Sequence, residues 1–495
     1  MFFKLPCLLI IFSILVPQIN SFAIFSDEQA SLRSVDTRKP THTSASPKPS
    51  SSSKPPSFPT LPSFPTPPSF PTPSRFPKPS SSSKPPSSPT PSSSPKPSDS
   101  NNLSDSGYKN FVYFANWDIY NRSYHIQELP ASQITHVLYA FWNVASDGTV
   151  SISDPNADLN KQYSADSWVY DDGKTLYGSL KQLYILKKHN RHLKTLMTVG
   201  GWTYSVNFPA AASTETTRLK FVSDVVSYIR DLGFDGVDID WEYPSDDTQA
   251  ANFVLLLAEL RKQLDNYAET NAPGYHFLIT VACSAGAKNY GKIHLSEMNK
   301  FIDNWNLMAY DYSGSWDTHV GHDANLYPSS NMYITPYNTH KAITDYVNAG
   351  VTPSKILLGI PLYGRSFVGT TGLGQSFNSV GPGSFENGIW DYKVLPKTGA
   401  VEKIDSESVA SYSYDASTQT LISYDNVEVV KKKAEYIQSQ SLGGAMFWEA
   451  SGDKSGKESL IGTTASAFNK LDTKENLLKY PASKYSNIVA GMPGE

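Results

Sequence analysis

The chain has 495 residues, a formal net charge of −4, and aromatic residues at 12% of its positions. Because lysine and arginine are not in excess, the composition argues against a nucleic-acid partner. The surplus of aromatic residues indicates a large core, and it also suits a cleft that stacks on flat ligand faces.

The first 23 residues have the pattern of a secretory signal peptide. Lys4 precedes an apolar run over residues 5–16, and Ser21 and Ala23 have the small side chains of a cleavage site. The run is short for a bilayer span, although a single membrane anchor is the alternative interpretation. We therefore expect a secreted, extracellular protein whose mature chain contains Cys283 alone, which excludes an internal disulfide.

A low-complexity region follows the predicted signal. Between residues 44 and 100 it consists almost entirely of Ser, Pro, Thr and Lys, and SSSKPP occurs at both 51–56 and 81–86. Such a composition cannot bury enough apolar surface to offset the entropy lost on ordering. We predict a Ser/Pro-rich disordered region over residues 24–106, either O-glycosylated or an unmodified extended spacer.

From residue 107 onward, short apolar runs recur, with helical patterns between several of them. Continuous rather than alternating hydrophobicity is typical of strands that are covered on both faces. The clearest helical patterns span residues 217–233 and 249–269, and Gly233 is a candidate C-cap of the first. The expected strands cover residues 111–116, 134–141, 194–200, 234–241, 277–283, 305–310, 355–361 and 443–448.

Eight strands alternating with helices predict an α/β fold, a (β/α)8 TIM barrel over residues 107–470. The excess length lies mainly in residues 362–427, between the seventh and eighth strands, where YSYDASTQTLISYD alternates like a hairpin. We predict a small α+β insertion there, forming one wall of a cleft. Residues 471–495 are expected to form a C-terminal tail, and Cys283 is expected to be a buried thiol rather than a nucleophile.

The fourth expected strand contains four carboxylates within DGVDIDWEYP, residues 235–244. Side chains alternate along a strand, so Asp238, Asp240 and Glu242 share one face, at the C-terminal strand end where barrel active sites lie. Asp235 has the other parity and is expected to serve from the beginning of the strand or a bend. Crowded like charges raise at least one pKa, which makes Glu242 the candidate general acid. The alternative is a solvated acidic strand end.

DGVDIDWE matches the DxxDxDxE signature of glycoside hydrolase family 18, the chitinases and their relatives. Thr198 stands where the family usually has Ser, and the insertion after LYGRSF resembles that of bacterial-type chitinases, which fungi also have. Further segments resemble the family in the expected order: TVGGW (198–202), NLMAYDYSGSWD (306–317), GIPLYGRSF (359–367) and GGAMFWEASGD (443–453).

The resemblance implies retaining, substrate-assisted hydrolysis of β-1,4 links between N-acetylglucosamine units, with no cofactor and no metal. The substrate's own 2-acetamido oxygen attacks the anomeric carbon to give an oxazolinium, while Glu242 protonates the leaving oxygen and then activates water. Asp240 is implied to orient the acetamido N–H, and Asp238 to share a proton with Asp240. Tyr310 is implied to bond the acetamido oxygen, and Asp235 to give structural or electrostatic support.

The resemblance also implies sugar-binding residues. Trp448 matches the tryptophan floor beneath the scissile sugar, since indole rings stack well on sugar faces. Gly200 and Gly201, which end the third strand, indicate close backbone approach. Trp117 and Trp142 fit a sugar platform and an ordinary core position equally well. Further contacts are implied for Trp202, Trp316, Tyr113, Met308, Asp311, Tyr363 and Arg365.

Three other functions fit parts of this pattern. An endo-N-acetylglucosaminidase that cuts N-glycan cores would share the family, a chitin-binding lectin would share the fold, and a metal-dependent hydrolase could use the acids as ligands. The expected partners are chitin and chito-oligosaccharides, with no nucleic acid and no membrane after signal removal. We expect a monomer, for which association with a cell wall stays open.

Overall fold

The computed structural model describes residues 107–166 and 173–495. The predicted signal peptide and Ser/Pro-rich region lie outside these described residues. Within the described part of the chain, no helix combines the length and the apolar character needed to cross a bilayer.

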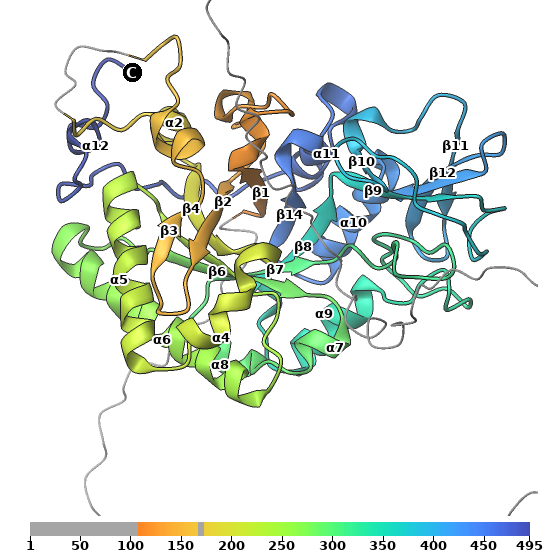
Figure 1. Ribbon diagram of the computed structural model, residues 1–495, viewed down its shortest axis with the longest axis horizontal. Helices are drawn as coiled ribbons and strands as arrows, with labels where there is room; N and C mark the ends of the chain where they lie inside the picture. The colour runs from red at the N-terminus through yellow and green to blue at the C-terminus, as the bar shows by residue number, and fades with distance from the viewer. Residues whose placement is uncertain (1–106, 167–172) are drawn as a thin grey trace, which may run out of the picture. The chain divides into compact units, whose positions relative to one another are not determined.

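Eight parallel strands of the described chain form a closed barrel, because β1 pairs with β14 on one side and with β2 on the other (Figure 1). The predicted (β/α)8 barrel is therefore confirmed. A short strand, β3 (Val150–Ile152), pairs antiparallel to the end of β2. In barrel order the strands are β1 (Lys109–Ala115), β2 (His136–Val144), β4 (Lys194–Gly200), β5 (Gly236–Asp240), β6 (Leu278–Ser284), β7 (Asn304–Met308), β8 (Ile356–Pro361) and β14 (Gly444–Trp448).

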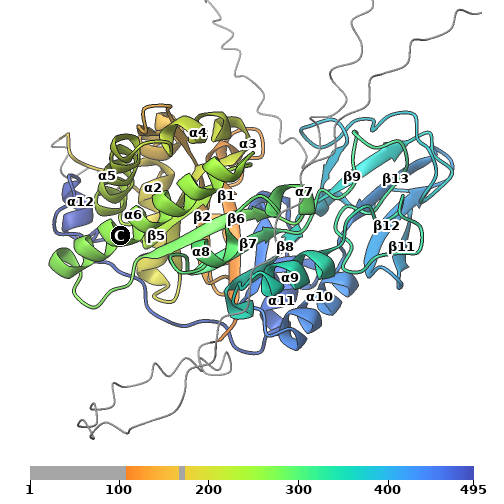
Figure 2. The ribbon, with the colours of Figure 1, turned by 90° about the horizontal axis from the view of Figure 1, so that it is seen from below.

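Helices surround the barrel on its outside (Figure 2). The two predicted helices are present as α5 and α6, and Gly233 ends α5 in the left-handed conformation with φ of 80°, which glycine adopts readily. The longer helices are α2 (Gly178–His189), α5 (Glu215–Leu232), α6 (Asp247–Asn271), α9 (Thr339–Asn348), α10 (Val427–Ser439) and α11 (Leu460–Ala467). The short ones are α3 (Gly201–Tyr204), α4 (Phe208–Ala211), α7 (Ala287–Tyr290), α8 (Leu295–Met298) and α12 (Ser486–Val489).

The segment between β8 and α10 forms a second, antiparallel sheet of five strands in the order β10-β9-β13-β12-β11, beside the barrel in both views (Figures 1 and 2). The predicted hairpin is β12 and β13. The helical content between the strands of this insertion is one 3-10 turn, Tyr392–Val394. The strands are β9 (Tyr363–Val368), β10 (Ile389–Asp391), β11 (Val401–Asp405), β12 (Ala410–Asp415) and β13 (Thr420–Tyr424).

Alternation along the barrel strands divides the core into two layers. On β1, Phe111 and Tyr113 point into the barrel, while Val112 and Phe114 pack against the outer helices. The same parity puts Asp238 and Asp240 of β5 on the inner face, with Val237 and Ile239 outside. A polar strand face is thus directed toward the centre of the barrel.

Residues 471–495, expected as a tail, pack against the end of the barrel where the parallel strands begin. Asn476 donates to the backbone oxygens of Lys187 at 2.8 Å and Leu193 at 2.7 Å. Tyr480, Ile488 and Met492 are buried in the main core cluster. The segment therefore covers the N-terminal end of the barrel, which is opposite the strand ends that carry the catalytic motif.

Candidate active site

Asp238 is fully buried on the inner face of β5, and four side chains donate hydrogen bonds to it. Its Oδ1 accepts from Thr280 at 2.6 Å and from Asn306 Nδ2 at 3.0 Å. Its Oδ2 accepts from Tyr113 at 2.7 Å and from Thr198 at 3.2 Å. Burial raises the pKa of Asp238, and all four hydrogen bonds oppose that rise because they stabilise the charged form. Asp238 is therefore the member of the acid row best suited to hold a negative charge.

Asp240 and Glu242 have fewer partners. Asp240 is 4% exposed, and its Oδ1 has no hydrogen-bond partner among the described residues. Burial, followed by the charges of Glu242 and Asp238, raises the pKa of Asp240 well above its usual range. Burial is also the main reason that the pKa of Glu242 rises to about 7. Burial and mutual repulsion therefore favour a proton on the Asp240–Glu242 pair over one on Asp238.

Glu242, the outermost acid, is held by Tyr243, which follows it in the sequence, and by Ser205, which lies beside it in space. Tyr243 donates its hydroxyl to Glu242 Oε2 at 3.0 Å, and the backbone N–H of Glu242 donates to Ser205 Oγ at 2.8 Å. The Tyr243 hydrogen bond lowers the pKa of Glu242, against the larger effect of burial and the further rise due to the charge of Asp311. The Glu242 carboxyl group is thus oriented by a hydrogen bond, and no described residue forms an ion pair with it.

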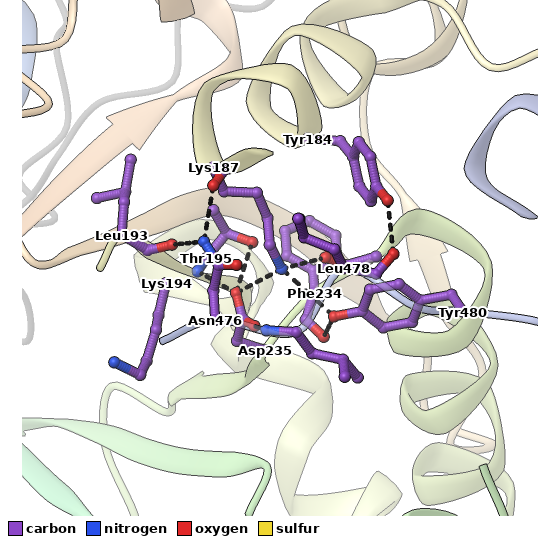
Figure 3. A network of polar contacts seen from close by, with 12 residues as sticks. Tyr184, Lys187, Leu193, Lys194, Thr195, Phe234, Asp235, Asn476, Leu478 and Tyr480 are labelled. Carbon is purple, nitrogen blue, oxygen red and sulfur yellow. Dashed lines mark hydrogen bonds and ion pairs between the residues drawn. The ribbon is translucent and has the colours of Figure 1, made fainter. Parts of the chain in front are cut away.

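Asp235 lies at the other end of the strand, away from the cleft, in the network drawn in Figure 3. Its Oδ2 forms an ion pair with Lys187 Nζ at 2.6 Å, and both side chains are fully buried. The carboxylate also accepts from the backbone N–H of Thr195 at 2.8 Å and of Leu477 at 2.9 Å. Lys187 in turn donates to Tyr480, so Asp235 joins β5, α2 and the C-terminal segment.

One cleft at the C-terminal strand ends brings together most of the residues implied to bind substrate. The Trp448 ring meets Tyr113 edge-on, with ring centroids 5.2 Å apart, and lies 5.8 Å from Phe141. The acids Asp240 and Glu242 open into the same cleft. The residues singled out from the sequence that line this cleft are Tyr113, Gly200, Gly201, Trp202, Asp240, Glu242, Met308, Tyr310, Asp311, Tyr363, Arg365 and Trp448.

The residues after β7 form another part of the cleft wall. Asp311 Oδ1 accepts hydrogen bonds from Tyr363 and from Arg365 Nε, each at 2.6 Å, so β9 of the insertion fixes this carboxylate. The Tyr310 hydroxyl contacts Met446 Sδ at 3.8 Å, and because a thioether is a weak acceptor, this hydroxyl can turn to a better one. Met308 lines the cleft beside Tyr310.

The remaining residues singled out from the sequence differ in whether they line the cleft. Trp117 lines the cleft, whereas Trp142 is fully buried in the core. Trp316 is not among the cleft-lining residues, and its ring lies 4.8 Å from the Arg365 guanidinium. A Cβ on Gly200 would lie 2.1 Å from the Asp240 backbone oxygen, which explains the close approach expected there.

Several residues of the site were not singled out from the sequence. Thr280 and Asn306 occupy inward positions on β6 and β7, inside the segments LITVACS and NWNLM. A polar residue at an inward position of an otherwise apolar barrel strand is the signal that would have identified them. The cleft also contains Arg122, Phe385 and Glu449, which lie outside the strands, and Asp391, which ends the short strand β10 of the insertion.

The sequence profile described as Glycosyl hydrolases family 18 matches residues 109–453. Endochitinase 1 of Metarhizium robertsii is 55% identical over 383 residues, which cover 77% of this chain and 90% of that protein. Chitinase 1 of Aphanocladium album is 52% identical over 388 residues, or 78% of this chain and 92% of that protein. Among solved structures, the catalytic domain of chitinase B from Arthrobacter TAD20 aligns with a TM-score of 0.67 at 32% identity, over 73% of this chain and 95% of that one.

Proposed function

The chain belongs to glycosyl hydrolase family 18 and hydrolyses chitin, and from this premise we propose that it does so by substrate-assisted catalysis with Glu242 as the acid and base. The observation that supports this role most directly is the pKa of Glu242, raised to about 7 in a cleft lined with aromatic side chains. A carboxylic acid that keeps its proton near neutral pH can protonate the glycosidic oxygen, and the resulting carboxylate can then deprotonate water.

The nucleophile in this proposal is the acetamido oxygen of the bound sugar. Asp238 is enclosed by four donors inside the barrel, so it is poorly suited to attack an anomeric carbon. Asp240 Oδ1 has no hydrogen-bond partner in the described part of the chain, and we assign Asp240 to the acetamido N–H and to the developing positive charge. Tyr310, whose hydroxyl donates to the weak acceptor Met446 Sδ within the described chain, is assigned to the acetamido oxygen.

Sugar binding in the proposal depends on aromatic surface and on the wall after β7. Trp448 would form the floor beneath the scissile sugar, with Trp202 and Tyr113 beside it and Met308 and Asp311 against the acetamido group. Tyr363 and Arg365 would act mainly by orienting Asp311, to which both donate. Trp316 would contribute to an outer sugar site, next to Arg365.

We further propose that the protein is secreted as a monomer. Residues 1–23 would direct export, residues 24–106 would separate the enzyme from a surface such as a cell wall, and residues 107–470 would form the catalytic barrel. Mass analysis of the secreted protein would test the cleavage site after Ala23. An intact N-terminus on secreted protein would contradict the signal assignment.

The mechanism is tested by the products from chitotetraose, followed by proton NMR from the first turnovers. Acetamido participation predicts that the β-anomer appears first, and that fully deacetylated chitosan is not cleaved even at concentrations that inhibit chitin hydrolysis. Initial α-anomer, or efficient cleavage of the deacetylated polymer, would overturn the mechanism. A high-mannose glycopeptide serves as the competing substrate, because cleavage of that substrate alone would favour an endo-N-acetylglucosaminidase.

A further inference from the structure

Asp323 is a buried acid that the catalytic motif does not include. It lies in the segment between β7 and α9, and its side chain is fully buried. Its Oδ1 accepts the backbone N–H of Asp311 at 3.1 Å, and its backbone oxygen accepts the N–H of Tyr312 at 2.9 Å. Asp311 has a φ of 59°, in the left-handed region that few non-glycine residues adopt. Asp323 therefore holds the backbone directly after Tyr310 in an uncommon conformation.

The insertion sheet fixes Asp311 and Asp323 together. Arg365 of β9 and Ser423 of β13 are direct partners in the antiparallel register. Arg365 Nε donates to Asp311 Oδ1 at 2.6 Å, and Ser423 Oγ accepts the backbone N–H of Asp323 at 3.0 Å. One cross-strand pair thus orients two aspartates of the barrel loop.

The carboxyl groups of Asp311 and Asp323 differ in the hydrogen bonds that they accept. Asp311 accepts from Arg365 and Tyr363, whereas Asp323 Oδ1 lies 3.7 Å from Arg365 Nε, beyond hydrogen-bonding distance. Asp323 Oδ2 has no hydrogen-bond partner among the described residues. A buried ionised carboxylate requires several donors, as Asp238 has, and a single backbone N–H does not supply them.

The other charged groups around Asp323 are already paired. Lys433 of α10 binds Asp425, and His322 Nε2 lies 3.1 Å from Asp405 Oδ2 of β11. Burial, followed by the charge of Asp311, raises the pKa of Asp323 well above its usual range, against the opposing effect of Arg365. Arg365 favours the ionised form of Asp323, but its Nε already donates to Asp311 and lies 3.7 Å from Asp323 Oδ1.

We propose that Asp323 acts as a neutral carboxylic acid that positions Asp311, and with it the cleft wall that contains Tyr310. The role rests on the proposed function, because Tyr310 and Asp311 are assigned there to the acetamido group. Asp323 touches neither the substrate nor Glu242 and works through the backbone of Asp311. Its neutrality leaves Asp311 as the carboxylate of this wall whose charge raises the pKa of Glu242.

Asparagine is the discriminating replacement, because it is neutral and retains an oxygen that can accept the Asp311 N–H. The variant D323L lacks that acceptor, and we expect its kcat/KM on a chromogenic chitobioside to fall ~10-fold or more. D323N is expected to recover most of that loss and to leave the alkaline limb of the pH profile in place. A downward shift of that limb in D323N would show that Asp323 is an anion, and full activity in D323L would exclude a positioning role.

Thermal unfolding provides a readout that does not depend on the mechanism or on substrate. An acid whose pKa is raised on folding makes the wild type lose stability as pH increases above its unfolded pKa of about 4. The melting temperature of D323N relative to wild type should therefore rise between about pH 4 and pH 7, by ~2 °C per pH unit.

The control variant for this measurement is D147N. Asp147 is exposed, and the hydrogen bond from the Thr149 N–H lowers its pKa, so the D147N difference should not increase with pH over that range. A D323N difference that is flat, or that falls as pH rises, would overturn the neutral state of Asp323. This result would leave the proposed mechanism intact, so the two failures are distinguishable.

Discussion

The two ends of β5 contain the same kind of residue in opposite surroundings. At the beginning of the strand, Asp235 has a buried lysine at 2.6 Å and further donors from two backbone N–H groups. At the other end, the described residues give Asp240 Oδ1 no hydrogen-bond partner, and they give Glu242 a tyrosine hydroxyl at 3.0 Å but no cation. Asp235 is therefore held by an ion pair and hydrogen bonds within the protein, whereas Asp240 and Glu242 have fewer partners among the described residues.

The two ends of β5 show two surroundings for a buried acid: Asp235 is paired with a lysine, and Glu242 has no such cation among the described residues. Lys187 pairs with Asp235 where the barrel strands begin, and removing one partner of such a buried pair is strongly destabilising. Among the described residues no cation pairs with Glu242, and burial raises its pKa to about 7, which in the proposed mechanism leaves a proton available for catalysis. The difference between the two ends of β5 can be tested with variants that change the charge of a side chain and keep nearly the same shape.

The largest effect is expected from E242Q, which preserves the shape of the side chain and removes its acidic proton. Turnover of chitotetraose should fall ~10²–10⁴-fold or more, while oligosaccharide binding measured by calorimetry is retained. The matched variant at the other end, D235N, should keep most of its turnover and lose thermal stability. Substantial turnover in E242Q, or stable but inactive D235N, would show that the two ends are not divided in this way.

The next effect is on stability, through Lys187. The variant K187M leaves the buried Asp235 carboxylate without its cation, which should lower the free energy of unfolding by ~3–5 kcal/mol in chemical denaturation. In the double variant K187M/D235N the unpaired charge is absent, so the loss should be smaller than the sum of the single losses. Strict additivity would contradict the pairing, and an altered pH profile in K187M would contradict the separation of the two ends.

The barrel was predictable because its strands and their order follow from short apolar runs that recur between helical patterns. Parity along β5 also predicted which acids share a face, and Asp235 was correctly expected at the beginning of the strand. The docking of residues 471–495 was missed because its contacts are single side chains, such as Asn476 and Tyr480, spread along an irregular segment. Such a segment has no period from which packing can be inferred.

The site was predictable where a residue belongs to a strand end and less so where loops determine its surroundings. Asp240 and Trp448 end their strands, Glu242 follows two residues after β5, and all three line the cleft. Trp316 lies in a long connection, and its contact with Arg365 depends on how the insertion sheet packs against that connection. Asp323 could not be recognised for the same reason, because its partner Ser423 is 100 residues away in the chain.

The smallest expected effects come from removing one tyrosine hydroxyl at each end of β5. Tyr243 donates to Glu242 Oε2, and this hydrogen bond lowers the pKa of Glu242 because it stabilises the carboxylate. Without it, in Y243F, the pKa should rise from about 7, so the acid stays protonated to higher pH. The alkaline limb of kcat/KM should move upward by about 0.5–1 pH unit.

At the other end, Tyr480 donates to the Phe234 backbone oxygen at 2.8 Å and accepts from Lys187 at 3.3 Å. Y480F should therefore lower the free energy of unfolding by ~1 kcal/mol and leave the pH profile unchanged. The same chemical change then affects proton affinity at one end of β5 and stability at the other. A downward shift of the limb in Y243F would mean that the hydroxyl stabilises the protonated acid, and any shift in Y480F would mean that the two ends are electrostatically coupled along the strand.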